Sequence, residues 1–297
     1  MFAGASLTYW IAFHVVVAVL LFVDLVLLQR KHHTVSVRMA WAWTAILAAL
    51  AFCFALLLSQ TQGRQPALEF LSGYLVEGSL SVDNLFVFLL MFRSLQLNKE
   101  QQHRVLLWGV LGAIVMRAIF IFIGTSLLAR FNWIEYVFGA FLLYAAVRLM
   151  QHKPADARPS AVIRWLQSRG VNRSDSGISS LFLVILAVEA TDLIFALDSI
   201  PAVLAISRDT FVVYTSNIFA ILGLRSLYFA LSHALDRLRL LHYGLALILA
   251  FVGIKMLIGR WYHIPVTWSL AFIMAVLAVF AIASRMTEPP AAATSAK

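Results

Sequence analysis

The sequence has little charge and almost no thiol. Only 12% of its 297 residues are charged, whereas soluble domains are typically about 25% charged. Cys53 is the single cysteine, so the chain can form neither an internal disulfide nor a Cys-x-x-Cys dithiol pair. It also lacks the glycine-rich G-x-x-x-x-G-K-[ST] loop that cradles nucleotide phosphates. These absences argue against a soluble enzyme, a dithiol redox protein and an ATP-driven pump.

Long apolar runs dominate the chain, which is 62% hydrophobic. Runs long enough to cross a bilayer recur along its length. We therefore predict an all-α, polytopic membrane protein with about nine transmembrane helices in one domain, residues 1–286, and no enzymatic activity. The predicted helices are 7–28, 39–58, 67–92, 105–128, 133–150, 179–203, 211–231, 240–259 and 265–284.

The basic residues are distributed unevenly between the loops. Most Lys and Arg residues follow the first, third, fifth and seventh predicted helices or lie in the C-terminal tail. The positive-inside rule then places the N-terminus outside and the C-terminus in the cytoplasm. The net charge of +9 is explained by these loops, so no nucleic-acid partner is expected. We predict a cytoplasmic loop at about 151–178 and a disordered cytoplasmic tail at 287–297.

Two predicted helices carry acidic stretches where a membrane helix should be apolar. A carboxylate at the bilayer centre costs about 2.5–3.5 kcal/mol on insertion scales, so five such groups need a reason. Carboxylate, amide and hydroxyl oxygens suit hard ions such as Mg²⁺, Ca²⁺ and Mn²⁺. The stretches therefore predict a cation site near the middle of the membrane. The candidate ligands are Glu77, Asp83, Asn84, Glu189, Asp192, Asp198 and Ser199.

The two stretches share one spacing. Glu77 precedes Asp83 by six residues, and Asp192 precedes Asp198 by the same distance. The two helices are predicted to cross the membrane in opposite directions, which is the arrangement of an inverted repeat, as found in secondary transporters. The three-helix copies would cover about 67–150 and about 179–259.

Helix geometry leaves the arrangement of the acids open. Glu77 and Asn84 lie on one face of an ideal helix, but six residues rotate by about 240°, so Asp83 points elsewhere. Either the acids serve different shells, or the helices bend. A bend would use the flexibility of Gly78 or the missing backbone donor of Pro201.

Five further polar residues could support such a site. We expect Arg117 and Arg225 each to pair with an acid of the motif helices, because buried arginines need carboxylate partners. Lys255 could neutralise a third acid. Asn217 could bind the ion or bond another helix, and Asp24 could line an entrance or snorkel to the surface. In the alternative interpretation, the acids and arginines only hold the bundle together.

The runs YLVEGSLSVDNLFVF (74–88), VEATDLIFALDSIPA (188–202) and YTSNIFAILGLRSLYF (214–229) resemble the TerC/Alx family of integral membrane proteins. The resemblance covers roughly residues 10–260. It implies a bacterial inner-membrane protein that exports metal ions, Mn²⁺ above all. The family is also linked to tellurium resistance, and some members are described as redox modulators.

The leading hypothesis is a secondary transporter that exports Mn²⁺ or a similar divalent ion through the acidic site. Glu189 would be a candidate proton carrier, because burial raises the pKa of a carboxyl group. The alternatives are a membrane-bound redox modulator and a non-transporting scaffold that delivers metal. The expected partners are the ion, the lipid bilayer and other envelope proteins, with no tightly bound cofactor.

Overall fold

The structure is a computed structural model that describes residues 6–29, 37–131, 133–151, 178–231, 240–259, 261–262 and 264–286. The predicted loop at about 151–178 and the tail at 287–297 lie almost wholly outside these ranges. A few side chains within the helices, those of Asp83 and Asp198 among them, are also not described. The described part contains nine helices and no strand. The helices are α1 (Leu7–Gln29), α2 (Val37–Thr61), α3 (Arg64–Ser94), α4 (Lys99–Arg130), α5 (Ile134–Gln151), α7 (Ile178–Leu204), α8 (Thr210–Leu231), α9 (Leu241–Ile258) and α10 (Val266–Met286).

Each predicted helix corresponds to one observed helix, so the all-α prediction is confirmed. The largest difference is at the start of α4, which begins at Lys99 instead of 105. Its first turn is polar, so a prediction based on apolar runs did not include it. A capping box stabilises this turn: Asn98 Oδ1 accepts from the Gln101 backbone N–H at 2.8 Å, and Gln101 Oε1 accepts from the Asn98 N–H at 2.9 Å.

Six of the nine described helices contain a stretch long and apolar enough to cross a membrane, namely α1, α2, α4, α5, α8 and α10. The other three are α3, α7 and α9. Two of these, α3 and α7, carry the acidic stretches and contain side chains that the structure does not describe. Length and composition therefore support a multi-pass membrane protein, while the crossing of α3 and α7 needs a separate argument.

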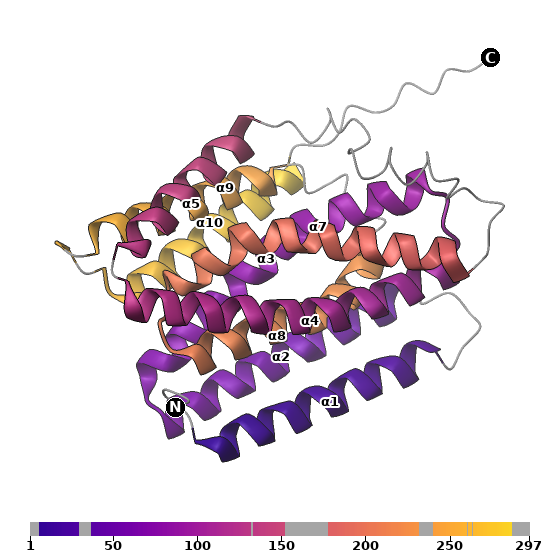
Figure 1. The fold of residues 1–297 in the computed structure, drawn as a ribbon, viewed down its shortest axis with the longest axis horizontal. Helices are drawn as coiled ribbons and strands as arrows, with labels where there is room; N and C mark the ends of the chain where they lie inside the picture. The colour runs from indigo at the N-terminus through magenta and orange to yellow at the C-terminus, as the bar shows by residue number, and fades with distance from the viewer. Residues whose placement is uncertain are drawn as a thin grey trace.

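The helices lie roughly along one direction, and three pairs pack closely (Figure 1). Helices α3 and α8 run parallel, because Phe70 meets Phe219 and, further along both helices, Phe92 meets Tyr228. Helices α4 and α7 also run parallel and are in close contact, because Gly109 lies beside Val188 and, further along both helices, Gly124 lies beside Leu204. The third pair, α5 and α9, is antiparallel.

Two glycines allow α5 and α9 to approach each other closely. A Cβ atom on Gly139 would lie 3.1 Å from the carbonyl oxygen of Gly253, and one on Gly253 would lie 3.0 Å from the carbonyl oxygen of Gly139. Small residues at a helix contact let the backbones approach, which is a common way for membrane helices to associate. Through this contact, α5 of the first predicted repeat packs against α9 of the second.

Helix α1 lies at the edge of the bundle (Figure 1) and packs mainly against α8. Near its start, the Trp10 and Phe13 rings contact Phe211 and Tyr214. Near its end, Asp24 meets Arg225. The bundle thus has a Glu69 end, where α1, α3, α5 and α8 begin and α7 and α9 end, and an opposite Asp24 end.

Candidate functional site

A fully buried arginine lies at the centre of the bundle. Arg117 of α4 is 0% exposed. Its Nη1 donates to Oε1 of Glu77 on α3, and its Nε and Nη2 lie 3.4 Å from Oδ2 and Oδ1 of Asp192 on α7. One guanidinium therefore lies between carboxylates from the two acidic stretches.

Two neutral side chains complete this group. Arg117 Nη1 also lies 3.2 Å from Ser199 Oγ and 3.2 Å from Asn217 Oδ1. The amide nitrogen of Asn217 donates to the second oxygen of Glu77 at 2.8 Å. We call Glu77, Arg117, Asp192, Ser199 and Asn217 the Arg117 cluster. Its members come from α3, α4, α7 and α8 and are at most 3% exposed.

The cluster forms on unbroken helices. Asp192 and Ser199 are seven residues apart, which places them two turns apart on one face of α7. Helix α7 continues through Pro201 to Leu204, and α3 continues through Gly78. Neither Pro201 nor Gly78 therefore ends its helix. The acids at 77 and 192 meet because their helices converge on Arg117.

Charge and hydrogen bonding in the cluster are nearly balanced. Two carboxylates face one guanidinium, which leaves one negative charge if all three groups are ionised. Removing one partner of a buried ion pair typically costs about 3–5 kcal/mol, because the other charge stays buried without compensation. The positive charge of Arg117 therefore compensates the burial of the Glu77 and Asp192 carboxylates.

The structure does not gather all the candidate ligands here. The Glu189 carboxylate packs against α4 at Gly112, where a Cβ atom would overlap it, and its Oε2 is buried without a hydrogen-bond partner. Asn84 is 3% exposed, and its amide nitrogen has no partner either. The side chains of Asp83 and Asp198 lie outside the described residues. Among the described side chains, no three His, Cys, Asp or Glu residues are grouped as metal ligands.

Arg225 has a different partner from the one we expected. Its Nε lies 3.2 Å from Oδ2 of Asp24, and its Nη2 donates to the Asp24 carbonyl oxygen at 3.1 Å. The expectation of an acid from the motif helices is wrong for the described side chains, because α1 packs on α8 and supplies the carboxylate. Asp24 is 8% exposed, so it does not snorkel. Lys255 donates to Ser269 at 3.0 Å and lies apart from the cluster.

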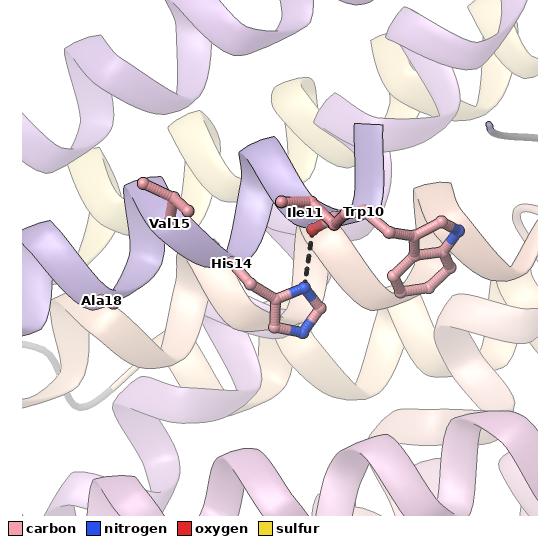
Figure 2. A pocket seen from close by; sticks show the side chains of 5 residues that line it. All are labelled: Trp10, Ile11, His14, Val15 and Ala18. Carbon is pink, nitrogen blue, oxygen red and sulfur yellow. Dashed lines mark hydrogen bonds between the residues drawn. The ribbon is translucent and has the colours of Figure 1, made fainter. Parts of the chain in front are cut away.

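His14 on α1 is a packing residue. Figure 2 shows its ring on the side of the helix, with Nδ1 bonded to the Trp10 carbonyl oxygen at 2.8 Å. A carbonyl can only accept, so Nδ1 is the donor, and a neutral ring then accepts the Tyr214 hydroxyl proton at Nε2, 3.0 Å away. The pocket beside it, lined by Trp10, Ile11, Val15 and Ala18, is almost wholly apolar. It offers an ion no ligands.

Sequence reasoning missed a second polar group, at the Glu69 end. Ser207 Oγ donates to Glu69 Oε2 at 2.5 Å, and Arg208 Nη2 lies 2.6 Å from Glu135 Oε2. The signal that could have found them is that all four lie at helix ends assigned to the same side of the membrane.

An all-helical bundle with several membrane-crossing segments and a buried charge cluster defines a polytopic integral membrane protein. The chain belongs to the integral membrane protein TerC family, whose model matches residues 62–291. The match begins at the turn between α2 and α3 and includes all members of the Arg117 cluster. Helices α1 and α2 precede it.

Relatives of similar length support this assignment. A protein of Salmonella typhi is 44% identical over 296 residues, covering 91% of each chain, and one of Escherichia coli K12 is 44% identical over 294 residues, covering 90% of this chain and 91% of its own. Both names describe them provisionally as the membrane-bound redox modulator Alx. A membrane protein of Myxococcus xanthus without an assigned function is 41% identical over 290 residues, covering 93% and 91% of the two chains. No solved structure matches the chain significantly.

Proposed function

We propose that the protein is a secondary transporter that exports a hard divalent cation, Mn²⁺ in particular, across the bacterial inner membrane. It would act without enzymatic chemistry, and the metal would be its cargo. The observation that carries the proposal is the Arg117 cluster. It places a positive group between two buried carboxylates, an amide oxygen and a hydroxyl oxygen, all drawn from four converging helices.

The guanidinium occupies the place that a cation would take. Glu77, Asp192, Asn217 and Ser199 all offer oxygen atoms, the ligands that hard divalent ions prefer. A divalent ion bound by both acids would repel Arg117, so ion binding and the observed pairing are alternatives. The observed arrangement then represents the ion-free transporter, in which Arg117 serves as the internal counter-ion.

The helix pairing supports an inverted repeat. If α3–α5 and α7–α9 are related by a two-fold axis in the membrane plane, the contact of α3 with α8 must have a counterpart in α7 with α4. Both pairs are closely packed and parallel, and α5 and α9 meet each other antiparallel, as that axis requires. Transporters with this symmetry bind their cargo where the repeats meet. Arg117 lies at that meeting point, between Glu77 of one copy and Asp192 of the other.

The names of the relatives favour a second candidate, a membrane redox modulator. The thiol of this chain is Cys53, on α2, whereas the cluster lies on α3, α4, α7 and α8. A single thiol cannot carry a dithiol–disulfide cycle within one chain. Redox effects of such a protein could instead follow from the level of a redox-active metal that it transports.

Proteoliposomes that contain purified protein and a Mn²⁺-sensitive dye test the proposal. We expect the wild-type protein to move Mn²⁺ and Asp192→Asn to reduce the flux to that of empty liposomes, because the site loses half of its negative charge. Glu100→Gln is the matched control, since Glu100 is an exposed acid paired with Arg104 on the surface of α4. Wild-type flux in Asp192→Asn would contradict the proposal.

The same assay separates the two candidates. Cys53→Ala should transport at the wild-type rate, because its thiol lies on a helix that contributes nothing to the cluster. Loss of flux in Cys53→Ala with intact protein would favour the redox candidate.

A further inference from the structure

A polar pocket of about 350 Å³ opens at the Glu69 end of the bundle. Glu69 at the start of α3, Glu135 at the start of α5 and Lys255 near the end of α9 line it, together with residues 204–208. The pocket is therefore built from both predicted repeats. Its two acids and two bases, counting Arg208, nearly cancel in charge.

The five residues that connect α7 to α8, 205–209, are fastened to the walls of this pocket. We call this segment the strap. Ser207, which is 4% exposed, donates to Glu69 of α3 at 2.5 Å. Arg208 pairs with Glu135 of α5 at 2.6 Å. These two interactions connect the strap to α3 and α5 of the first predicted repeat.

The strap is hydrogen-bonded within itself and to the start of α8, and it joins α7 directly to α8. Asp209 Oδ1 accepts from the backbone N–H of Phe211 at 2.8 Å, and the Asp209 N–H donates to Ser207 Oγ at 3.2 Å. The strap can therefore leave Glu69 and Glu135 only if the neighbouring ends of α7 and α8 move with it. Those helices carry Asp192 and Asn217 of the Arg117 cluster.

The pocket lies directly beyond the cluster. Leu204, in its wall, follows Ser199 by five residues on α7, which is about 7.5 Å along a helix at 1.5 Å per residue. Glu77 follows Glu69 by eight residues on α3, about 12 Å. The buried side chains of Ala202 and Val203, 0% and 1% exposed, lie on α7 between Ser199 of the cluster and Leu204 in the pocket wall. This apolar layer separates the pocket from the cluster in the observed state.

We propose that the pocket is the vestibule through which the ion leaves the Arg117 cluster, and that the strap is its gate. Release of Ser207 from Glu69 and of Arg208 from Glu135 lets the end of α7 swing away and opens the apolar layer. The freed Glu69 carboxylate then meets the departing ion. A nearly neutral vestibule suits passage, because an ion must be able to leave a conduction pathway as well as enter it. This inference rests on the proposed transport function.

The first experiment measures how often the strap opens. In a Cys53→Ala background, Met256→Cys places one thiol on α9 in the pocket wall, at a position 4% exposed. A membrane-impermeant thiol reagent should label it slowly. Ser207→Ala should raise the labelling rate about tenfold, because a buried hydrogen bond to a charged group is lost. Arg208→Ala should raise it only about twofold, because that ion pair is more exposed.

Arg130→Ala is the control, since Arg130 is an exposed arginine at the same end of the bundle that does not line the pocket. It should leave the labelling rate unchanged. Equal rates in all four proteins would overturn the gate, and so would an Arg130→Ala effect as large as that of Ser207→Ala.

The second experiment locks the gate. A Gln65→Cys/Ala205→Cys variant in the Cys53→Ala background places one thiol on α3 and one on the strap, both in the pocket wall, and is joined with a short, reducible bifunctional thiol reagent in proteoliposomes. Mn²⁺ flux should stop on cross-linking and return on reduction, so that each sample is its own control. Unchanged flux in cross-linked protein would overturn the gate. If the wild-type protein moves no Mn²⁺, the transport proposal fails, and with it the role of the pocket as an ion vestibule, while the labelling rates still report whether the strap opens.

Discussion

Arg117 is 0% exposed and lies between two carboxylates. Its guanidinium donates to both acidic stretches, and its Nη1 also approaches Ser199 and Asn217. A planar, forked cation can satisfy several oxygens at once, which a compact ammonium cannot. We therefore expect the size and shape of this side chain to matter as well as its charge.

We predict that Arg117→Ala lowers the stability of the folded protein by about 3–5 kcal/mol, because Glu77 and Asp192 would stay buried without their partner. Arg117→Lys should restore only part of the loss. Thermal unfolding in detergent measures both. Arg104→Ala is the control on the same helix, since its exposed pair with Glu100 is worth at most about 1 kcal/mol. Equal melting temperatures for Arg117→Ala and Arg104→Ala would refute this account.

Mn²⁺ should partly reverse the Arg117→Ala defect. A ligand that binds only the folded state stabilises it, and an ion between the two freed carboxylates would replace the lost charge. No upward shift of the melting temperature with Mn²⁺, relative to its effect on wild type, would show that the cluster pairs charges without binding the ion.

The sequence shows which residues are unusual, but it does not readily show which of them are in contact in the folded protein. Buried acids and arginines stand out by type, and Glu77, Asp192 and Arg117 could be named as candidates. Their partners depend on helix packing. Spacing alone gave no reason to join Arg225 to Asp24, because 201 positions separate them and only the position of α1 beside α8 brings them together.

At the scale of helices, the apolar pattern determines most of the fold. Every helix could be placed because a bilayer requires about 20 apolar residues per crossing. The apolar pattern does not show which helices pack against each other, because that depends on the shapes of the helix surfaces. Gly139 and Gly253 show this, since neither has a recognisable motif, yet their backbones meet at the α5–α9 contact.

We predict that Gly253→Val loosens the α5–α9 contact and destabilises the protein by about 1–3 kcal/mol, as overpacking typically does. The new side chain would enter space held by the Gly139 carbonyl oxygen and by the Leu142 and Leu143 side chains. Gly223→Ala is the control, because a Cβ atom there meets nothing within 4 Å. Thermal unfolding of both variants checks this. A Gly253→Val protein as stable as the control would mean that α5 and α9 can separate freely.

At the scale of the whole molecule, the two acidic helices determine the topology. Helices α3 and α7 are not among the six candidate crossing helices found in the described residues, which leave out the side chains of Asp83 and Asp198. Their acids are buried inside the bundle instead of facing lipid: Glu77 and Asp192 are 0% and 3% exposed. Polar groups inside membrane proteins are tolerated where they pair within the bundle. We therefore expect both helices to cross.

Reporter fusions test this arrangement across α3. Alkaline phosphatase is active only outside the cytoplasm, and green fluorescent protein folds to its fluorescent state in the cytoplasm. We predict that fusions after Gln62 show phosphatase activity and fusions after Leu97 show fluorescence, because the positive-inside rule places these turns on opposite sides. Fusions after Phe131 should return to phosphatase activity, and a fusion at the C-terminus should fluoresce. If fusions after Gln62 and Leu97 report the same side, α3 does not cross. The first and second repeats could then not be inverted copies, and Glu77 could not approach Asp192 at the middle of a membrane.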